Sequence, residues 1–240
     1  MLIVSLDTSS QVSSVAVLSE ERVAAEVSMQ GALTHSETLM PHIELALQMA
    51  RAKKTELDGI AVSIGPGSFT GLRIGLATAK MMAYALNIPM ICVPTLEALA
   101  CHYMGAVGLR ILPMMDAQKG NVYVQEFRWC PEGEGVRLSE EHSLSILPLT
   151  EVLDALAGTE LPAVLLGDAT RRNDFPALPA NVGIAPLHLR MPRAACVGLA
   201  GLARLQRGET DDPVTAVPLY LRRSEAEVLW EQQHGGAAAS

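Results

Sequence analysis

The sequence predicts an α/β protein made of two similar halves, the second of which is reduced. Short apolar runs rich in β-branched residues alternate with helix-length segments in the first part of the chain, as in folds that pack helices on a sheet. A strand, an aspartate, a polar turn and another strand occur at Asp7 and again at Asp116, which indicates a weak internal duplication. We expect the first half at residues 1–105, the second at 106–222 and a tail at 223–240.

Three apolar runs open the chain, at residues 1–6, 12–18 and 23–29. Short polar turns join them, so they predict three consecutive antiparallel strands. Asp7 ends the first strand and is followed by Thr8 and two serines. Such a turn can hold a phosphate or a metal-bound water, but Asp and Ser are also frequent in hairpins because they bond to local backbone groups. Asp7 and Thr8 are therefore candidates for phosphate contact, with the purely local role left open.

A capping box at Thr34 and Glu37 predicts a first helix that runs to about Lys54, with a kink or a new start at Pro41. Its apolar residues form a stripe that is wider than packing on a sheet normally requires. Methionine-rich faces suit adaptable interfaces, although filling a core is their commoner use. The residues of this helix that we expect at a partner interface are Leu39, Met40, Ile43, Leu47 and Ala50.

The stretch 59–87 predicts a strand at 60–64, a glycine-rich turn at 65–71 and a helix at 72–86. Small residues recur every four positions along this helix, so one face permits close approach of a neighbouring helix or sheet. The helix is apolar nearly all round, which is typical of a helix buried inside the fold or against a partner. The residues of this helix that we expect at a partner interface are Gly71, Gly75, Leu76, Ala79 and Ala83.

The glycine-rich turn allows two interpretations. Backbone N–H groups at a helix N-terminus bind anions, so Gly65, Gly67, Ser68 and Arg73 are candidates for nucleotide or phosphate contact. However, the turn lacks the Lys-Ser/Thr pair of a P-loop and the glycine spacing of a dinucleotide fingerprint. Glycines are common in turns for backbone reasons alone, so we favour a tight turn with close packing.

The later segments predict a shortened copy of the first half. The predicted strands lie at 90–93, 110–115, 122–129 and 163–166, and the predicted helices begin at Thr95, Glu151, Val197 and Ser224. Residues 168–192 hold four prolines and little periodicity, so they are expected to be mainly loop. Residues 213–221 are expected to be extended.

Composition disfavours several classes of function. The net charge of −8 repels a phosphate backbone, and an aromatic content of 4% leaves few side chains on which bases could stack. Direct nucleic-acid binding is supported only by Arg171, Arg172 and the arginines of 190–193. The longest uncharged run, 81–96, contains two prolines and is too short to cross a membrane. We therefore expect a cytoplasmic protein without a basic leader.

No pattern typical of a metal site is present. His35 and His42 lie seven apart on the first predicted helix, where Glu37 or Glu44 could be a third ligand, but the H-E-x-x-H spacing of zinc sites is absent. The cysteines show no C-x-x-C spacing, so they are expected to be reduced thiols. They are Cys92, Cys101, Cys130 and Cys196.

Several segments of the chain resemble the TsaB family, also called YeaZ. They are LDTSSQVSSVAVL, HSETLMPHIELAL, DGIAVSIGPGSFTGLRIGLATAKMMAYALNIP with TLEALA after it, MDAQKGNVYVQEF and PLYLRRSEAE. The resemblance implies an ASKHA fold, like that of actin and sugar kinases, with two similar domains and the second reduced. It also implies a role in making threonylcarbamoyladenosine on tRNA, as the dimerisation partner of the catalytic subunit TsaD. The ATPase TsaE would join the assembly, and the chain alone would form a homodimer.

The sequence departs from the catalytic proteins of this fold at three places. No histidine pair follows the strand at 90–93, where TsaD has a metal-binding H-x-x-x-H helix. The turn after Asp7 lacks the glycine of the Asp-x-Gly-Thr phosphate loop, and the Gly-Gly of an adenosine pocket appears only as Gly167-Asp168. No catalytic residue and no cofactor of its own are therefore expected, and ATP or ADP with Mg would bind only within the complex.

The expected function is that of a non-catalytic scaffold. It would bind and activate TsaD for threonylcarbamoyl transfer to the adenosine 3′ of the anticodon, in tRNAs that read codons starting with A. The alternative is an ASKHA-type nucleotide-hydrolysing enzyme that acts alone, with Asp7, Thr8 and Asp116 around a magnesium nucleotide.

Overall fold

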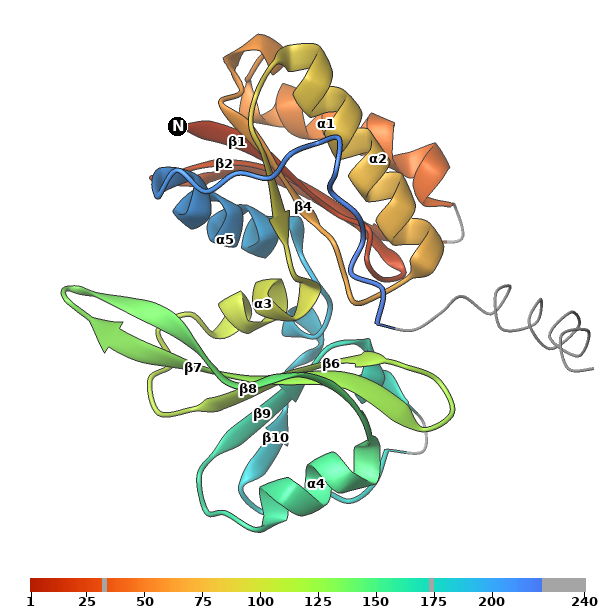
Figure 1. Cartoon of the computed structure of the whole chain (residues 1–240), viewed down its shortest axis with the longest axis vertical. Helices are drawn as coiled ribbons and strands as arrows, with labels where there is room; N and C mark the ends of the chain where they lie inside the picture. The colour runs from red at the N-terminus through yellow and green to blue at the C-terminus, as the bar shows by residue number, and fades with distance from the viewer. Residues whose placement is uncertain (32–33, 173–174, 222–240) are drawn as a thin grey trace, which may run out of the picture.

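Figure 1 shows the structure, a computed structural model in which residues 1–31, 34–172 and 175–221 are described. Two five-stranded sheets form its framework. The first sheet has the order β3-β2-β1-β4-β5. Its strands β1, β2 and β3 are antiparallel, as predicted, while β4 and β5 run parallel to β1. The bounds are β1 Leu2–Asp7, β2 Val12–Ser19, β3 Val23–Gln30, β4 Gly59–Ser63 and β5 Met90–Val93.

The second sheet repeats the first. Read from the opposite edge, its order is β8-β7-β6-β9-β10, with β6, β7 and β8 antiparallel and β9 and β10 parallel to β6. Asp7 and Asp116 thus end equivalent strands, β1 and β6, so the internal duplication predicted from the sequence is confirmed. The bounds are β6 Arg110–Asp116, β7 Asn121–Glu132, β8 Gly135–Pro148, β9 Ala163–Leu166 and β10 Val182–Ile184.

The helices form layers around and between the two sheets (Figure 1). Helices α1 (His35–Ala50) and α2 (Phe69–Leu86) cover one face of the first sheet, and α5 (Ala194–Gln206) covers the other. Helix α3 (Thr95–Ala100) lies between α5 and the second sheet, whose far face carries α4 (Leu149–Ala157). Short 3₁₀ turns occupy η1 Lys54–Glu56, η2 Cys101–Tyr103, η3 Asp168–Arg171 and η4 Leu187–Leu189.

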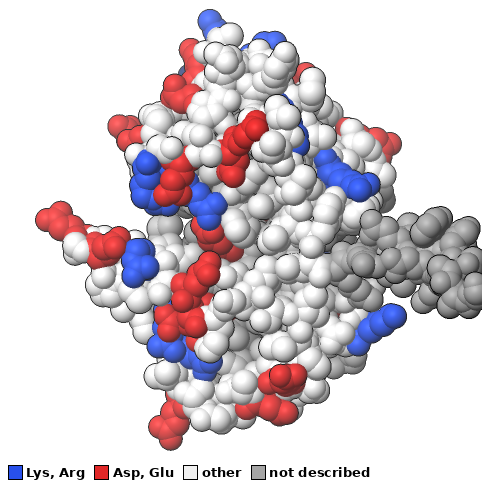
Figure 2. Space-filling view, in the orientation of Figure 1, with Lys and Arg blue, Asp and Glu red and all other residues white. Residues whose placement is uncertain are grey.

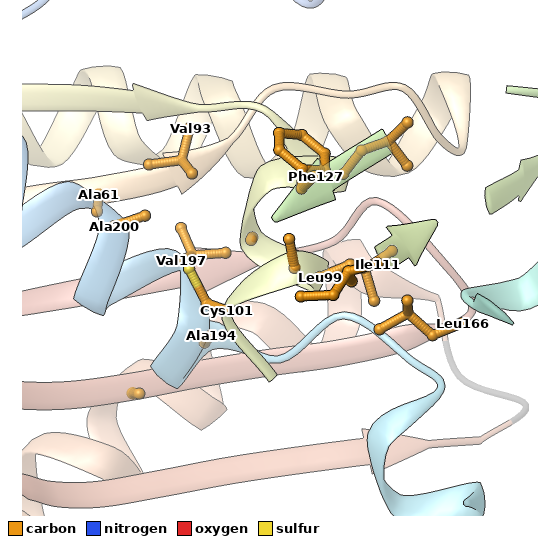
Figure 3. Close-up of a cluster of buried hydrophobic side chains, with 14 of the residues drawn as sticks. Ala61, Val93, Leu99, Cys101, Ile111, Phe127, Leu166, Ala194, Val197 and Ala200 are labelled. Atoms are coloured by element: carbon orange, nitrogen blue, oxygen red, sulfur yellow. The ribbon is translucent and has the colours of Figure 1, made fainter. Parts of the chain in front are cut away.

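One apolar cluster joins the two sheets through α3 and α5 (Figure 3). Its side chains come from the first sheet, from both helices and from the second sheet. Members labelled in the figure are Ala61, Val93, Leu99, Ile111, Phe127, Leu166, Ala194, Val197 and Ala200. Two further clusters lie under α1 and α2 and under α4. Helix α5 packs on β1, β2, β4 and β5. A segment from late in the chain therefore covers the second face of the first sheet.

The predicted capping box opens α1. The Glu37 carboxylate accepts the Thr34 N–H at 2.9 Å, and the helix then passes Pro41 without a break. The new start that Pro41 suggested therefore does not occur. The helix also ends earlier than predicted, at Ala50, because Arg51 adopts a left-handed conformation with φ 55° that cannot continue it.

Some elements differ from the sequence prediction. Strand β8 was not predicted, because its inward side chains are only partly buried at the sheet edge and its apolar alternation is weak. Residues 168–192, predicted as mainly loop, contain β10. Residues 213–221, expected to be extended, form a turn at 213–215 and have no regular structure at 216–220, so they belong to neither sheet. The predicted helix that begins at Ser224 lies outside the described residues.

Candidate functional site

The structure places the predicted interface stripe of α1 and α2 mainly against the first sheet. Leu39, Ile43, Leu76, Ala79 and Ala83 are buried in the cluster between these helices and the strands. Leu47 and Ala50 are half-buried at its margin, and Met40 is exposed. The sequence pattern could not separate a stripe that the chain covers itself from one that a partner covers, because both are equally apolar.

A second set of apolar side chains on the same helices points to solvent. On α2, Met81 is 66% exposed and Tyr84 is 81% exposed. On α1, Met40, Leu45 and Met49 are exposed. These side chains form the apolar surface that another molecule can reach without any rearrangement of the core.

The C-terminal strap, defined here as residues 211–221, extends this surface. The Lys80 ammonium on α2 donates to the Val214 carbonyl at 3.5 Å, so the strap runs beside the helix. The valines at 214 and 217 are 83% and 68% exposed. Figure 2 shows that the area over α2 and the strap carries few charged side chains, which gather on the other side of this view. We call Met81, Tyr84, Val214 and Val217 the α2–strap surface.

The strap is held at both ends by hydrogen bonds to the first sheet. The N–H of Asp211 donates to the Met90 carbonyl at 2.8 Å, and its carboxylate accepts the Cys92 N–H at 2.7 Å. At the other end, the Leu219 N–H donates to the Ile64 carbonyl at 2.7 Å. These bonds also cover the outer edge of β5, which would otherwise expose unpaired backbone groups.

Arg73, a candidate for phosphate contact, is engaged with the strap. Its guanidinium lies 4.1 Å above the centre of the Phe69 ring, and its Nε donates to the Tyr220 hydroxyl at 3.0 Å. Gly65 also meets the strap, since a Cβ at this position would lie 3.1 Å from the Leu219 carbonyl oxygen. Arg73 therefore fixes the end of the strap on α2, and the absence of a side chain at Gly65 lets the strap pass close to the turn before that helix.

Three further glycines, one in the glycine-rich turn and two on α2, allow close contact with the turn that follows β1. A Cβ on Gly67 would lie 2.2 Å from the Ser9 carbonyl oxygen, and one on Gly71 would lie 2.0 Å from the Thr8 carbonyl oxygen. Gly75 is equally tight, with a Cβ only 2.2 Å from the Thr8 hydroxyl. The structure thus uses these glycines for close packing, the interpretation that the sequence favoured.

Two N–H groups at the start of α2 have partners within the chain. The Ser68 N–H donates to the Ser9 carbonyl at 2.7 Å, and the Gly71 N–H donates to the Ser68 hydroxyl at 3.2 Å. Thr8 in turn donates through its hydroxyl to the Gly71 carbonyl at 2.8 Å. A phosphate at this position would have to displace the turn after β1.

Asp7 and Asp116 lie in different surroundings despite their equivalent positions. Asp7 is fully buried, accepts the backbone N–H of Ser9 at 3.1 Å and its hydroxyl at 3.0 Å, and has a pKa that burial raises. Asp116 is half-exposed, with its N–H donated to Asp168 at 2.8 Å. Burial raises the pKa of Asp168. No contact between Asp7 and Asp116 is found in the described part of the chain.

The two histidines of α1 have separate structural partners. His35 donates through Nε2 to the Ser10 carbonyl at 2.8 Å, while Nδ1 of His42 lies 3.1 Å from the Ser13 hydroxyl. Burial lowers the pKa of His42. Within residues 1–31, 34–172 and 175–221, no cluster of three or more His, Cys, Asp or Glu side chains could hold a metal ion, and no helix is long and apolar enough to cross a membrane.

Comparisons with known proteins give the family. The Bacillus subtilis protein TsaB, named for tRNA threonylcarbamoyladenosine biosynthesis, is 32% identical over 235 residues, which cover 96% of this chain and 98% of that protein. This chain belongs to the TsaB family. The structure of YeaZ from Pseudomonas aeruginosa is similar to that of this TsaB-family chain, with a TM-score of 0.71 and 27% identity over 92% of this chain and 99% of that one. The predicted ASKHA fold, with a reduced second half, is confirmed.

A related family also matches part of this TsaB-family chain. The model of the TsaD family, tRNA N6-adenosine threonylcarbamoyltransferase, matches residues 27–137. The Geotalea uraniireducens protein of that name is 48% identical over 64 residues, which are 27% of this chain and 19% of that protein. The region matched by the family model contains both α1 and α2.

Sequence reasoning missed the strap and its exposed valines. Residues 211–221 have no regular periodicity, and their place beside α2 depends on hydrogen bonds to residues more than a hundred positions away in the chain. The one available signal was the pair of valines in a segment without a strand or helix pattern.

Proposed function

We propose that this chain is a non-catalytic partner subunit in the biosynthesis of threonylcarbamoyladenosine on tRNA. It binds a TsaD-family protein and activates it for threonylcarbamoyl transfer to the adenosine 3′ of the anticodon, in tRNAs that read codons starting with A. The observation that carries this proposal is the exposed apolar surface of α1, α2 and the strap on a chain of the TsaB family.

The free-energy cost of leaving apolar side chains in water supports a binding partner for this surface. Complete burial of a side chain such as methionine contributes about 1.5–3 kcal/mol, so burial of several exposed apolar side chains together gives substantial binding energy. Contiguous apolar patches on a folded protein mark interaction sites more often than single exposed residues do. Met81, Tyr84 and the strap valines satisfy this description, because the strap lies directly beside the helix.

The family comparison favours a TsaD-family protein as the partner. A TsaD-family model matches the region that includes α1 and α2, so a TsaD-family protein has a related pair of helices. Two proteins with related surfaces can pack with approximate twofold symmetry, as identical subunits do in a homodimer. The same reasoning supports a homodimer of the isolated chain. TsaE would join the complex, and tRNA would be bound through the complex.

The geometry around Asp7 supports a role without catalysis. Asp7 is buried, and the turn that follows it is packed against the glycines of α2. A magnesium nucleotide held by Asp7, Thr8 and Asp116, as in an enzyme that acts alone, would require this packed turn to open. ATP or ADP with Mg is therefore assigned to the complex and not to this chain.

A double substitution on α2 tests the partner role. Met81→Glu with Tyr84→Glu places two charges on the exposed surface, and we expect at least a tenfold loss of affinity for the TsaD-family partner in a pull-down or calorimetric titration. Because both side chains are exposed, the variant should keep the fold, and its far-ultraviolet circular dichroism spectrum should match that of the native chain.

Met104→Glu is the matched control, because Met104 is exposed but lies outside both helices and the strap. It should leave binding unchanged. Undiminished binding by the double variant would contradict the proposed surface. Ile43→Glu is less informative, since Ile43 is 2% exposed and its substitution would disrupt the core.

A further inference from the structure

One cationic side chain on the outer face of α2 has no acidic partner. Arg73 is exposed, and its guanidinium lies 4.1 Å above the centre of the Phe69 ring and 6.0 Å from the centre of the Tyr220 ring. Its Nε donates to the Tyr220 hydroxyl at 3.0 Å, and neither Nη group makes a hydrogen bond or an ion pair with a described residue. The N–H donors of both Nη groups are therefore available to another molecule.

The two aromatic rings hold this charge in one place. Phe69 begins α2 and Tyr220 lies near the end of the strap, and their ring centres are 5.0 Å apart. A guanidinium above a ring face gains from cation–π attraction, so the contacts restrain the arginine. A side chain that is already restrained loses less conformational entropy on binding than a free one. Arg73 is thus preorganised for contact with a partner.

Arg73 shares its face of α2 with the exposed apolar side chains of the α2–strap surface. Positions 73, 77, 81 and 84 follow the spacing of one helix face, and the residues at all four are exposed. Ala77 is small, so a partner can approach closely between the arginine and the apolar pair Met81 and Tyr84. A protein that covers the apolar pair therefore also comes within reach of the guanidinium.

The charge of α2 is of one sign. The helix contains Arg73 and Lys80 and no acidic residue. The two cations are seven positions apart, so they lie on the same side of the helix. A partner surface opposite this side gains from negative charge and is opposed by positive charge.

We propose that Arg73 forms an ion pair with a carboxylate of the protein that covers the α2–strap surface. This inference rests on the proposed function, in which that protein is a member of the TsaD family. A guanidinium can bind a carboxylate through two parallel N–H···O bonds, which fixes orientation and adds affinity. Arginine is also among the residue types that most often contribute a large share of the binding energy at an interface.

A protein carboxylate fits this position better than a phosphate of nucleic acid. The net charge of −8 repels a nucleic-acid backbone. Surfaces that bind such backbones carry clustered lysines and arginines, whereas the exposed neighbours of Arg73 on this face are Ala77, Met81 and Tyr84.

Arg73→Gln tests the ion pair in titrations of the full chain with the TsaD-family protein. We expect roughly a tenfold loss of affinity at low salt, and a weaker dependence of affinity on sodium chloride concentration than in the native chain. Arg22→Gln is the matched control, because Arg22 is exposed in the turn before β3 and its substitution removes the same charge. It should change neither quantity. Equal effects of the two variants would show that only the net charge matters, which would overturn the proposal.

Two further variants separate the ion pair from the position of the strap. Arg73→Lys keeps the charge, so it should retain the salt dependence and lose only part of the affinity. Tyr220→Phe keeps the ring and removes the acceptor of the Nε bond, so affinity should fall only slightly. A loss in Tyr220→Phe as large as that in Arg73→Gln would mean that the strap, not the charge, controls binding, and the proposal would fail.

Failure of this inference can be told from failure of the proposed function. Undiminished binding by Arg73→Gln, beside lost binding by Met81→Glu with Tyr84→Glu, would overturn the ion pair alone. Undiminished binding by both variants would contradict the proposed surface as well. Normal protein binding by Arg73→Gln with weaker binding of tRNA to the complex would assign Arg73 to nucleic acid and would also overturn the proposal.

Discussion

The two halves of the molecule share one strand order but differ in the segment after the fourth strand of each sheet. After β4 the chain forms α2, a helix of 18 residues, whereas after β9 it forms only the four-residue turn η3. The fifth strand is correspondingly shorter in the second half, where β10 has three residues. The two helices with exposed apolar side chains, α1 and α2, belong to the first half, whereas α3 and α5 lie between the two sheets.

The turns after β1 and β6 show the same contrast. The first turn is packed under the glycines of α2 and buries Asp7, whereas the second lacks such a helix and leaves Asp116 half-exposed. The same strand-turn unit is thus packed in the core in the first half and exposed to solvent in the second half. The close packing of α2 on the turn after β1 is one physical difference between the halves.

The largest effect is expected where α2 meets the turn after β1. Gly71→Ala places a Cβ 2.0 Å from the Thr8 carbonyl oxygen, which is backbone and cannot move away alone. We expect a loss of more than about 4 kcal/mol in the free energy of unfolding, or no stable fold. Urea denaturation followed by circular dichroism measures it.

The matched control lies in the second half. Gly183 on β10 has no atom within 4 Å of an added Cβ, so Gly183→Ala should change the free energy of unfolding by less than about 0.5 kcal/mol. Similar losses in the two variants would show that close packing does not distinguish the halves.

A smaller effect is expected from the buried ion pair of the second half. Arg110 donates to the Glu126 carboxylate through Nε at 2.7 Å and through Nη2 at 2.8 Å, and both side chains are nearly inaccessible. Glu126→Gln leaves the guanidinium without its charged partner, so we expect a loss of about 3 kcal/mol in urea denaturation. Glu132→Gln, which removes an exposed pair with Arg137, should cost little. Equal losses would contradict the structural role of the buried pair.

The smallest effect is a difference in pH dependence between the two halves. Burial alone would raise the pKa of Glu126, but its bonds to Arg110 lower it overall, so its stabilisation is present above the unfolded pKa of about 4.3 and is lost as the pH falls through the folded value. Asp7 behaves in the opposite way. Burial raises its pKa, so stability falls as the pH rises from its unfolded value of about 3.9 to its folded value.

Asp7→Asn and Glu126→Gln should therefore change the pH profile of the unfolding free energy with opposite sign. Asp7→Asn removes a rise in the free energy of unfolding that occurs as the pH falls. Glu126→Gln removes a fall in the free energy of unfolding that occurs as the pH falls. Profiles that change in the same direction would show that one of the two carboxyl groups has been assigned the wrong environment.

The sequence predicted the parts of the fold that local pattern determines. The strand, glycine turn and helix at 59–87 were found because their apolar runs are long and their turn residues are distinctive. Strand β8 was missed because it is an edge strand, and its neighbours, not its own pattern, determine its structure. The sequence also could not show which apolar side chains of α1 and α2 face the sheet and which face solvent. Ile43 lies in the core and Met81 at the surface, yet both are equally apolar in the sequence.

Reconstitution of tRNA modification tests the partner role most directly. The chain would be mixed with a TsaD-family protein, TsaE, tRNA and the small-molecule substrates, and threonylcarbamoyladenosine would be measured with each protein omitted in turn. We predict no product from this chain alone, product from the full mixture, and loss of product when the chain is omitted or carries Met81→Glu with Tyr84→Glu. Full product formation without the chain, or product formed by the chain alone, would contradict the assignment.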